Sequence, residues 1–229
     1  MVTFGILEKA DITPAELKGV KLPVPGEHNI YNALAAISVA KAYGIDLKIC
    51  KKSLENAKSI AGRMEIVANA PFKVIVDYAH TPVQLENVYK ALFGSNLICV
   101  LGSCGGGRDK WKRPVLGELA DKYCRKVIIT NEDPYDEDPM EIIDAVAAGV
   151  LKGKKGKWRL NTNYWKILDR HEAISKAIVM AGHGDVVIVT GKGAEEVMAV
   201  GENKFEPFSD RRVVRYELSK RFNMPISEE

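Results

Sequence analysis

The sequence lacks any long apolar run, and no stretch approaches the roughly 20 apolar residues that a membrane-spanning helix requires. Its first residues, MVTFGILEKADITP, also lack the basic segment followed by an apolar segment that is typical of a signal peptide. The four cysteines form no C-x-x-C pair and no cluster with histidine, which favours buried thiols in a reducing compartment over a disulfide framework or a zinc site. We therefore expect a cytoplasmic protein without membrane insertion, in which Cys50, Cys99, Cys104 and Cys124 are apolar fillers.

A strong excess of charge of one sign is missing as well. The net charge is +3 over 229 residues, with lysine and arginine scattered along the chain. The densest basic stretch, Lys152 to Lys157, is typical of a solvated loop, with contact to phosphate or nucleic acid as the alternative. We do not expect a nucleic-acid-binding protein. Hydrophobic residues make up 46% and charged residues 28%, as in globular proteins with a buried core.

Two regions of the chain differ in their pattern. Up to about Asn69 there is one strand-like segment, from Val2 to Leu7, and two helical segments. The first helix follows PGEHN and ends near Gly44, and the second spans roughly Leu47 to Ser59. One strand and two helices are too few for a complete α/β layer, so we interpret residues 1–69 as the end of a larger domain.

From residue 70 onward, strands and helices alternate. The helix that begins at Pro82 has Thr81 as its N-cap, and Asp169 and Glu172 have the spacing of a capping box at the start of another. This alternation predicts an open, mostly parallel α/β sheet, whose ligands bind beyond the carboxyl ends of the strands. The predicted strands are continuous apolar runs typical of buried parallel strands, at Lys73 to Tyr78, Leu97 to Leu101, Lys126 to Thr130 and Val186 to Thr190.

The loop after the second of these strands reads GSCGGGRDKWKRP. Its glycines let backbone N–H groups face an anion. It matches neither G-x-x-x-x-G-K-[ST], which occurs nowhere in the chain, nor G-x-G-x-x-G. Arg108 directly after three glycines suits a two-pronged grip on a carboxylate, with a flexible solvated turn as the alternative.

Acidic side chains follow the third and fourth of the predicted strands. In TNEDPYDEDP, Glu137 and Asp138 are typical of a helix N-terminus and need no ligand, whereas Asp133 is closest to the strand end and is a candidate for contact with a cation or amine. In TGKGAEEVM, Glu195 is the candidate acid, and Glu196 is expected to be a solvated helix residue.

The segment VDYAHTP follows the first of the predicted strands. Asp77 and His80 in this segment are either site residues or a turn cap and a structural histidine. No arrangement of serine or cysteine with histidine indicates a catalytic nucleophile.

Five segments together resemble the signature of the Mur ligase family: GEHNIYNALAA, AGRMEIV, VDYAHTP, GSCGGGRDKWKRP and GKGAEE. The form YAHTP is similar to that of the MurE type, which adds the third residue of the peptidoglycan stem peptide. The resemblance implies a Rossmann-like C-terminal domain over residues 70–229, after the end of a central ATP-binding domain over residues 1–69. It also implies ATP and Mg²⁺ as cofactors, and UDP-N-acetylmuramoyl-dipeptide and a free amino acid as partners. ATP converts a substrate carboxylate to an acyl phosphate, which the amino group then attacks.

The resemblance also implies roles for individual residues. On the nucleotide side, Arg63 corresponds to a hinge arginine at the phosphates and Asp77 to the acid at the ribose hydroxyls, with His80 beside it. Asn29 and Asn32 correspond to a pair that contacts adenine.

On the amino-acid side, Arg108 corresponds to the arginine that grips the incoming amino acid. Glu195 corresponds to the acid at its amine, and Gly191 lines the same pocket.

Several positions depart from the family pattern. Asp133 and Tyr135 replace the Asn and Arg of the D-N-P-R motif of diaminopimelate-adding members, and Ala194 and Gly107 replace a His and an acid. Tyr135 cannot supply a positive charge for the second carboxylate of diaminopimelate. An acidic pocket made by Asp133 and Glu195 fits an ammonium group, so the sequence predicts lysine or a similar diamine as the substrate.

The family's phosphate-binding loop, its Mg²⁺ ligands and its modified lysine are expected upstream of this sequence. We therefore predict no catalytic residue and no metal ligand within the chain, and expect it to be part of a longer ligase that is inactive alone. The alternative is a non-catalytic module that binds a nucleotide or an amino acid. A folylpolyglutamate synthase is disfavoured by the forms VDYAHTP and GKGxE.

Overall fold

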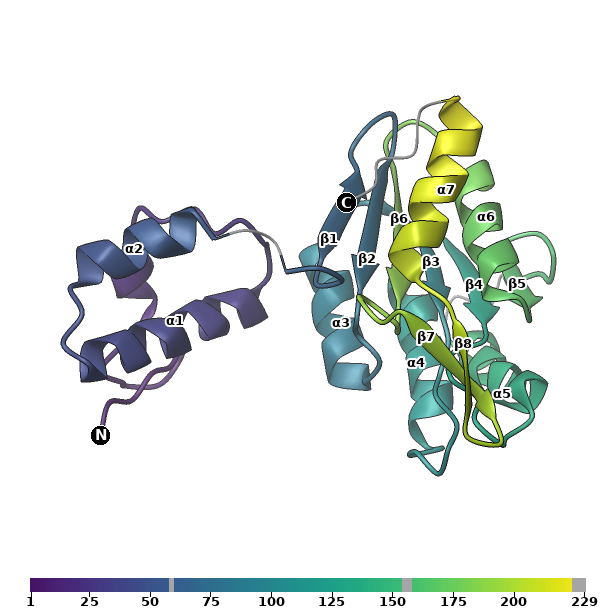
Figure 1. Cartoon of the computed structure of the whole chain (residues 1–229), viewed down its shortest axis with the longest axis horizontal. Coiled ribbons are helices and arrows are strands. Elements are labelled where there is room, and N and C mark those ends of the chain that lie inside the picture. Colours follow the sequence, from purple (N-terminus) through teal and green to yellow (C-terminus); the bar gives the residue numbers. More distant parts are fainter. Residues whose placement is uncertain (58–59, 154–157, 224–229) are drawn as a thin grey trace. The chain divides into compact units, whose positions relative to one another are not determined.

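The chain forms two units, Met1–Ser59 and Ile60–Glu229, in a computed structural model that describes residues 1–57, 60–153 and 158–223 (Figure 1). This division comes earlier than the expected domain boundary at residue 69. The reason is that strand β1 (Glu65–Ala68) pairs antiparallel with β2 (Lys73–Asp77) and so joins the sheet of the second unit. Most of the predicted basic loop, residues 154–157, lies outside the described residues. None of the described helices is long and apolar enough to cross a membrane.

The first unit consists of a short 3-10 helix, η1 (Pro14–Leu17), and the helices α1 (Glu27–Ala42) and α2 (Leu47–Glu55). Asp46 caps α2 by accepting from the Lys48 N–H, and α2 ends at Glu55, before the expected end at Ser59, which is outside the described residues. These elements pack around a small core of Ile12, Leu34, Ile37 and Cys50.

The predicted strand from Val2 to Leu7 is wrong. Within the described residues this segment forms only an isolated bridge between Phe4 and Ile12. Asp11 folds back on Thr3 and accepts hydrogen bonds from its N–H and its hydroxyl, at 2.9 and 2.8 Å. The segment therefore closes a local loop and does not extend along a partner strand.

The second unit contains a sheet whose described strands have the order β1-β2-β6-β3-β4-β5. All neighbours pair parallel except β1 with β2, so the mostly parallel α/β sheet is confirmed. The four predicted strands are confirmed as β2, β3 (Asn96–Leu101), β4 (Lys126–Thr130) and β6 (Asp185–Thr190). The sequence did not reveal β1 or β5 (Tyr164–Ile167), because each is a four-residue edge strand without a continuous apolar run.

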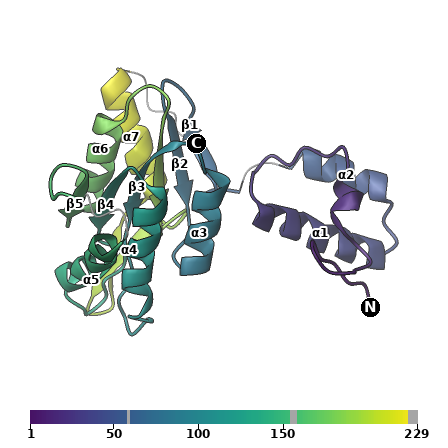
Figure 2. The same ribbon diagram turned by 180° about the vertical axis from the view of Figure 1, so that it is seen from behind.

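Helices cover both faces of this sheet (Figures 1 and 2). One face carries α3 (Pro82–Ala91), α4 (Lys112–Tyr123) and α5 (Pro139–Lys152), and the other carries α6 (Arg170–Met180) and α7 (Asp210–Phe222). The predicted N-caps are present: Thr81 accepts from the Gln84 N–H, and Asp169 accepts from the Glu172 N–H at 2.8 Å. Asp138 likewise caps α5, as expected for an acid that needs no ligand.

The segment after β6 is not a helix. It forms a hairpin of β7 (Val197–Gly201) and β8 (Lys204–Pro207), so the expectation that Glu196 lies in a solvated helix is wrong. Glu196 is exposed and pairs with Arg212 of α7 at 2.9 Å. The four apolar residues of VMAV show no alternation, since the neighbours Met198 and Ala199 are both buried, and the run is too short to distinguish a strand from a helix.

Two glycines bring α4 and α5 into direct backbone contact. A Cβ on Gly117 would lie 2.0 Å from the backbone oxygen of Val146, and a Cβ on Gly149 would lie 1.8 Å from that of Pro114. Both distances are far below any real van der Waals contact, so the two helices approach as closely as they do only because both positions lack a side chain.

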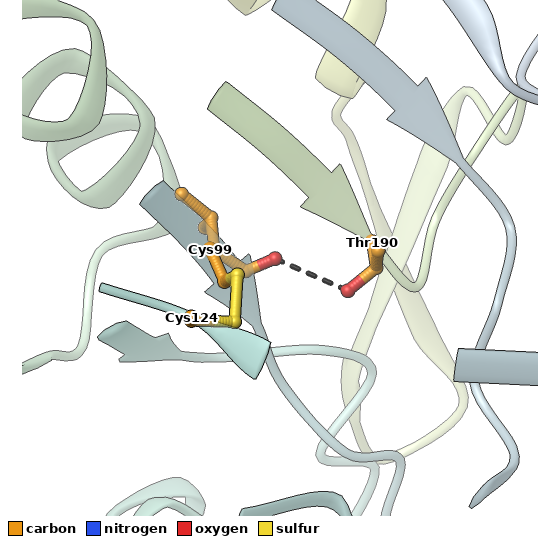
Figure 3. Close-up of a disulfide and its surroundings, with 4 residues drawn as sticks. Cys99, Cys124 and Thr190 are labelled. Carbon is orange, nitrogen blue, oxygen red and sulfur yellow. Dashed lines mark hydrogen bonds between the residues drawn. A yellow bond between two sulfur atoms is a disulfide. The ribbon is translucent and has the colours of Figure 1, made fainter. Parts of the chain in front are cut away.

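The expectation of four free cysteines is wrong, because Cys99 and Cys124 form a disulfide (Figure 3). Cys99 lies in the central strand β3, and Cys124 caps the end of α4, just before the neighbouring strand β4. The parallel crossover β3-α4-β4 returns the chain to the same sheet edge, which brings the two Cα atoms to 6.1 Å although 25 residues separate them in sequence. Cys50 and Cys104 are free. The argument from thiols to a reducing compartment therefore no longer holds.

Reduction of this disulfide is expected to lower the free energy of unfolding by about 3 kcal/mol, because the bond closes a loop of 25 residues in the unfolded chain. Urea unfolding with and without dithiothreitol measures the change. The double variant C99A/C124A serves as the control and should not respond to dithiothreitol. An equal response from both proteins would contradict the prediction.

Candidate substrate site at the carboxyl ends of the strands

The loops that follow β2, β6, β3 and β4 meet at one edge of the sheet, because these strands are parallel neighbours. The loop after β2 is tied to the start of α4 by the Lys112 ammonium, which donates to the His80 backbone oxygen at 3.2 Å. The loop after β3 is tied to the loop after β4 by the Gly105 N–H, which donates to the Asp133 backbone oxygen at 2.9 Å. The edge is therefore one continuous surface, as the sequence predicted.

Lys192 lies at the centre of this surface and is almost completely buried, with 1% of its area exposed. Its ammonium donates to both carboxylate oxygens of Asp133 at 2.7 Å and pairs with Glu195 at 2.7 Å. Burial acts to lower the pKa of Lys192, but the hydrogen bonds to Asp133 and Glu195 outweigh it and raise the pKa. The cation between the two predicted substrate acids is thus a side chain of the protein itself.

The carboxylate of Asp133 is held by a side chain and by a backbone group. Besides Lys192, its carboxylate accepts from the Ala199 N–H of β7 at 2.8 Å, and its own backbone adopts the left-handed region with φ of 41°. Tyr135 is also left-handed, with φ of 51°, and its ring lies against Gly106 of the loop after β3. Asp133 therefore contacts a cation of the chain itself, and its contact with a substrate stays a prediction.

Tyr78 connects the two ends of the site. Its hydroxyl donates to Glu195 at 3.0 Å, and the guanidinium of Arg63 stacks over its ring at 4.4 Å from the centroid. His80 packs edge-on against the same ring, with ring centroids 4.7 Å apart, and one of its ring nitrogens contacts the Tyr78 backbone oxygen. The structure therefore gathers Arg63, His80 and Glu195 around one aromatic ring.

Asp77 is buried at the end of β2 and binds backbone groups. Its two carboxylate oxygens accept from the Met64 and Ala79 N–H groups, each at 2.7 Å. The contact with Ala79 is the turn cap that was one of the two alternatives predicted for Asp77. The contact with Met64 fixes the loop that carries Arg63. A role for Asp77 at a ribose stays a prediction.

Arg108 is exposed in the loop after β3. In the part of the chain that the structure describes, its guanidinium makes no hydrogen bond or ion pair. The neighbouring basic residues are committed to the protein: Lys110 and Arg113 pair with Glu137 at 2.9 and 3.0 Å. Arg108 is therefore the cation of this loop that is available to a carboxylate.

Asn29 and Asn32 lie in the first unit, at the start of α1. The side-chain amide of Asn32 donates to the side-chain oxygen of Asn29 at 3.3 Å, so the two residues share one helix face, as expected. Asn29 also donates to the Pro25 backbone oxygen at 2.9 Å. Their contact with adenine stays a prediction.

Sequence reasoning missed two charged residues of this edge. The sequence pattern assigned no role to Lys192, which lies between Gly191 and Gly193, or to Glu132 in TNEDPYDEDP. Glu132 is 3% exposed and follows β4 directly. The signal available in the sequence was a charged residue placed just after an apolar strand. Charged residues at such positions are seldom buried without a partner or a function.

Comparison with known proteins gives consistent matches. Residues 62–193 match the family model described as Mur ligase, glutamate ligase domain. The chain is 41% identical over 212 residues to the UDP-N-acetylmuramoyl-L-alanyl-D-glutamate–2,6-diaminopimelate ligase of Clostridioides difficile strain 630, covering 91% of this chain and 42% of that protein. It is 37% identical over 242 residues to the ligase of the same name from Halalkalibacterium halodurans, covering 97% and 48%. The chain thus spans less than half the length of these relatives.

Solved structures show the same fold. A structure of a UDP-N-acetylmuramoyl-L-alanyl-D-glutamate–2,6-diaminopimelate ligase superposes with a TM-score of 0.63 and 30% identity, covering 89% of this chain and 40% of that one. The UDP-N-acetylmuramate-alanine ligase MurC of Thermotoga maritima superposes with a TM-score of 0.62 over 84% of this chain and 44% of that one, at 24% identity, which supports the fold alone.

Proposed function

The chain belongs to the Mur ligase family, and on this premise we propose that it supplies the amino-acid-binding part of an ATP-dependent ligase in peptidoglycan synthesis. The proposed reaction joins a free amino acid to UDP-N-acetylmuramoyl-L-alanyl-D-glutamate in the cytoplasm. One observation carries this proposal: an uncommitted arginine, Arg108, lies on the same sheet edge as the carboxyl groups of Glu195, Asp133 and Glu132. Such an edge offers opposite charges to the carboxylate and the amine of an amino acid.

For the amino acid we propose 2,6-diaminopimelate. The expectation of lysine depended on Asp133 and Glu195 both being open to an external ammonium, but the Lys192 ammonium already pairs with both and leaves one net negative charge between them. The relatives at 35–41% identity are named as diaminopimelate ligases, and this also favours the dicarboxylic substrate. Tyr135 supplies no charge, so Arg108 is the cation that the loop after β3 offers to a carboxylate of this substrate.

The nucleotide side of the proposal involves Arg63, which stacks on Tyr78 with its guanidinium at the surface. We propose that it meets the phosphates of ATP, that Asp77 and His80 lie near the ribose, and that Asn29 and Asn32 contact adenine. Within the described ranges, no group of three or more His, Cys, Asp or Glu residues is arranged to hold a metal ion. When bound, Mg²⁺ would neutralise phosphate charge.

Calorimetric titration of the 229-residue chain with diaminopimelate and with lysine tests the substrate. We expect tighter binding of diaminopimelate, and we expect Arg108→Ala to weaken it about 10- to 100-fold, since a charge-assisted hydrogen bond contributes about 1.5–3 kcal/mol. Arg212→Ala is the matched control, because Arg212 is an exposed arginine that pairs with Glu196.

Two results of the titration would contradict the proposal. Tighter binding of lysine would exclude diaminopimelate as the preferred substrate. Failure of the chain to bind either amino acid, with its fold confirmed by circular dichroism, would remove the support for an amino-acid-binding part. A second experiment uses a chimera in which this chain replaces the matching part of the Clostridioides difficile relative. If the chimera binds the amino acid but does not catalyse ligation, the result favours the non-catalytic module.

A further inference from the structure

A cavity of about 450 Å³ lies at the amino ends of β3 and β4, at the opposite end of the strands from the candidate substrate site. Its wall includes Asn96, Cys124, Arg125 and Trp158. Asn96 and Arg125 are exposed, so the cavity is open to solvent. Its volume is within the range of sites that bind small molecules.

The disulfide between Cys99 and Cys124 borders this cavity through one of its two residues. Cys124 is 3% exposed and forms part of the cavity wall, whereas Cys99 is 0% exposed, lies inside the central strand β3 and does not line the cavity. Cys99 is also enclosed by its pairing partners, Val127 of β4 and Ile188 of β6. A small molecule that enters the cavity therefore meets Cys124 and not Cys99.

Arg125 gives the cavity a positive charge. It directly follows Cys124, and 51% of its side chain stays exposed although it pairs with Asp185 at 3.2 Å. Thiol–disulfide exchange begins with attack by a thiolate, and a neighbouring cation favours this anionic form of a thiol. The cavity thus combines an open approach, a positive charge and one residue of a disulfide.

We propose that this cavity is an exchange site at which a low-molecular-weight thiol opens the Cys99–Cys124 bond. The thiolate attacks the Sγ of Cys124, a bond forms between the two sulfur atoms, and Cys99 leaves as a thiolate that takes a proton from solvent. A second thiolate then attacks the sulfur of the attached thiol, and Cys124 leaves with the electron pair and is protonated. Two small thiols are thereby oxidised to one small disulfide, and the protein disulfide is reduced to two thiols.

Opening of the bond is expected to act on the candidate substrate site through α4, and this step rests on the proposed function. Sulfur atoms that are no longer bonded must move apart, and a closely packed interior has little free space for them. Cys99 is fixed in the central strand, so the movement falls on Cys124 and the end of α4. This helix begins at Lys112, shortly after Arg108, and touches α5 through the backbone at Gly117. The reduced chain should therefore bind the amino acid more weakly.

Two single variants test the exchange site. Glutathione disulfide is incubated with folded Cys99→Ala and with folded Cys124→Ala, and mass spectrometry of peptides locates the attached glutathione. Cys99→Ala should gain glutathione on Cys124, because that residue borders the cavity, and Cys124→Ala should leave Cys99 unmodified. Attachment to Cys99, or no attachment to Cys124, would overturn the proposal.

The wild-type chain gives a second readout that does not depend on cysteine variants. Reduced glutathione is added without denaturant, and opening of the disulfide is followed by alkylation and mass spectrometry. The rate should rise in proportion to the glutathione concentration, and Arg125→Gln should lower it about 2- to 5-fold. Lys122→Gln is the matched control, because Lys122 is an exposed cation that pairs with Glu86 and does not line the cavity. A rate that does not depend on glutathione would show that the bond opens only when the chain unfolds, and would overturn the exchange site.

Calorimetric titration with diaminopimelate tests the effect on the substrate site. The oxidised chain should bind at least about 5-fold more tightly than the reduced chain, both with folds confirmed by circular dichroism. C99A/C124A should bind equally with and without reductant. Equal affinities of the oxidised and reduced wild-type chains would overturn the effect on the site. If neither form binds diaminopimelate or lysine, the proposed function fails, whereas the exchange site is decided by the glutathione experiments.

Discussion

Replacing Asp210 by alanine is expected to lower the free energy of unfolding by about 3–5 kcal/mol, because it leaves a buried arginine without its counter-charge. Arg170 and Asp210 are 1% and 0% exposed in their side chains and form a two-pronged pair, with both hydrogen bonds at 2.8 Å. Arg170 also donates to the backbone oxygens of Asn131 and Thr190, at 3.1 and 2.8 Å. The pair therefore joins the starts of α6 and α7 to the ends of β4 and β6.

Urea unfolding of Asp210→Ala at pH 7 measures this loss. Glu196→Ala is the matched control, because Glu196 also pairs with an arginine of the same helix, but at an exposed position, with side chains 76% and 45% exposed. Its removal is expected to change the free energy of unfolding by about 0–1 kcal/mol. Equal losses in the two variants would show that burial does not determine the strength of these pairs.

Replacing Lys192 by methionine is expected to lower the free energy of unfolding by about 3 kcal/mol at pH 7 and to abolish binding of the amino acid. Without the ammonium, Asp133 and Glu195 are two like charges with no compensation, and Asp133 is largely buried. Their mutual repulsion, together with the burial of Asp133, is the expected cause of the lost stability.

Urea unfolding at pH 7 measures the loss of stability, and calorimetric titration measures binding. Lys204→Met is the control, since Lys204 pairs with Glu202 at the surface, and it should match wild type in both measurements. A loss of stability in Lys192→Met no larger than that in Lys204→Met would contradict the prediction.

The sequence predicted those parts of the fold that have long, regular patterns. The strands β2, β3, β4 and β6 are continuous apolar runs and were found, whereas β1 and β5 are short edge strands that derive their structure from pairing with a neighbour. The hairpin after Glu196 has too few apolar residues to show a period, so the sequence does not distinguish it from a helix. Caps such as Thr81 and Asp138 were predictable, because each acts within three residues of itself.

The candidate site was predictable in its loops but not in its pairings. Parallel strands place Arg108, Asp133 and Glu195 at one edge, and this follows from strand order alone. The contact of Lys192 with Asp133 joins residues 59 positions apart, and no local pattern indicates that a chain lysine will occupy the place of a ligand. The disulfide between Cys99 and Cys124 was missed for a similar reason, since only the crossover between β3 and β4 brings the two residues together.

The contact between α4 and α5 at Gly117 and Gly149 limits how specificity in this family can be recombined. Each helix follows directly on a loop of the candidate site, one carrying Arg108 and the other Asp133 and Tyr135. Because the two helices touch through backbone atoms, neither loop can be shifted without moving the other. An exchange of substrate preference between relatives should therefore succeed when residues 102–152 are transplanted as one block, and fail when either loop is transplanted with its helix alone.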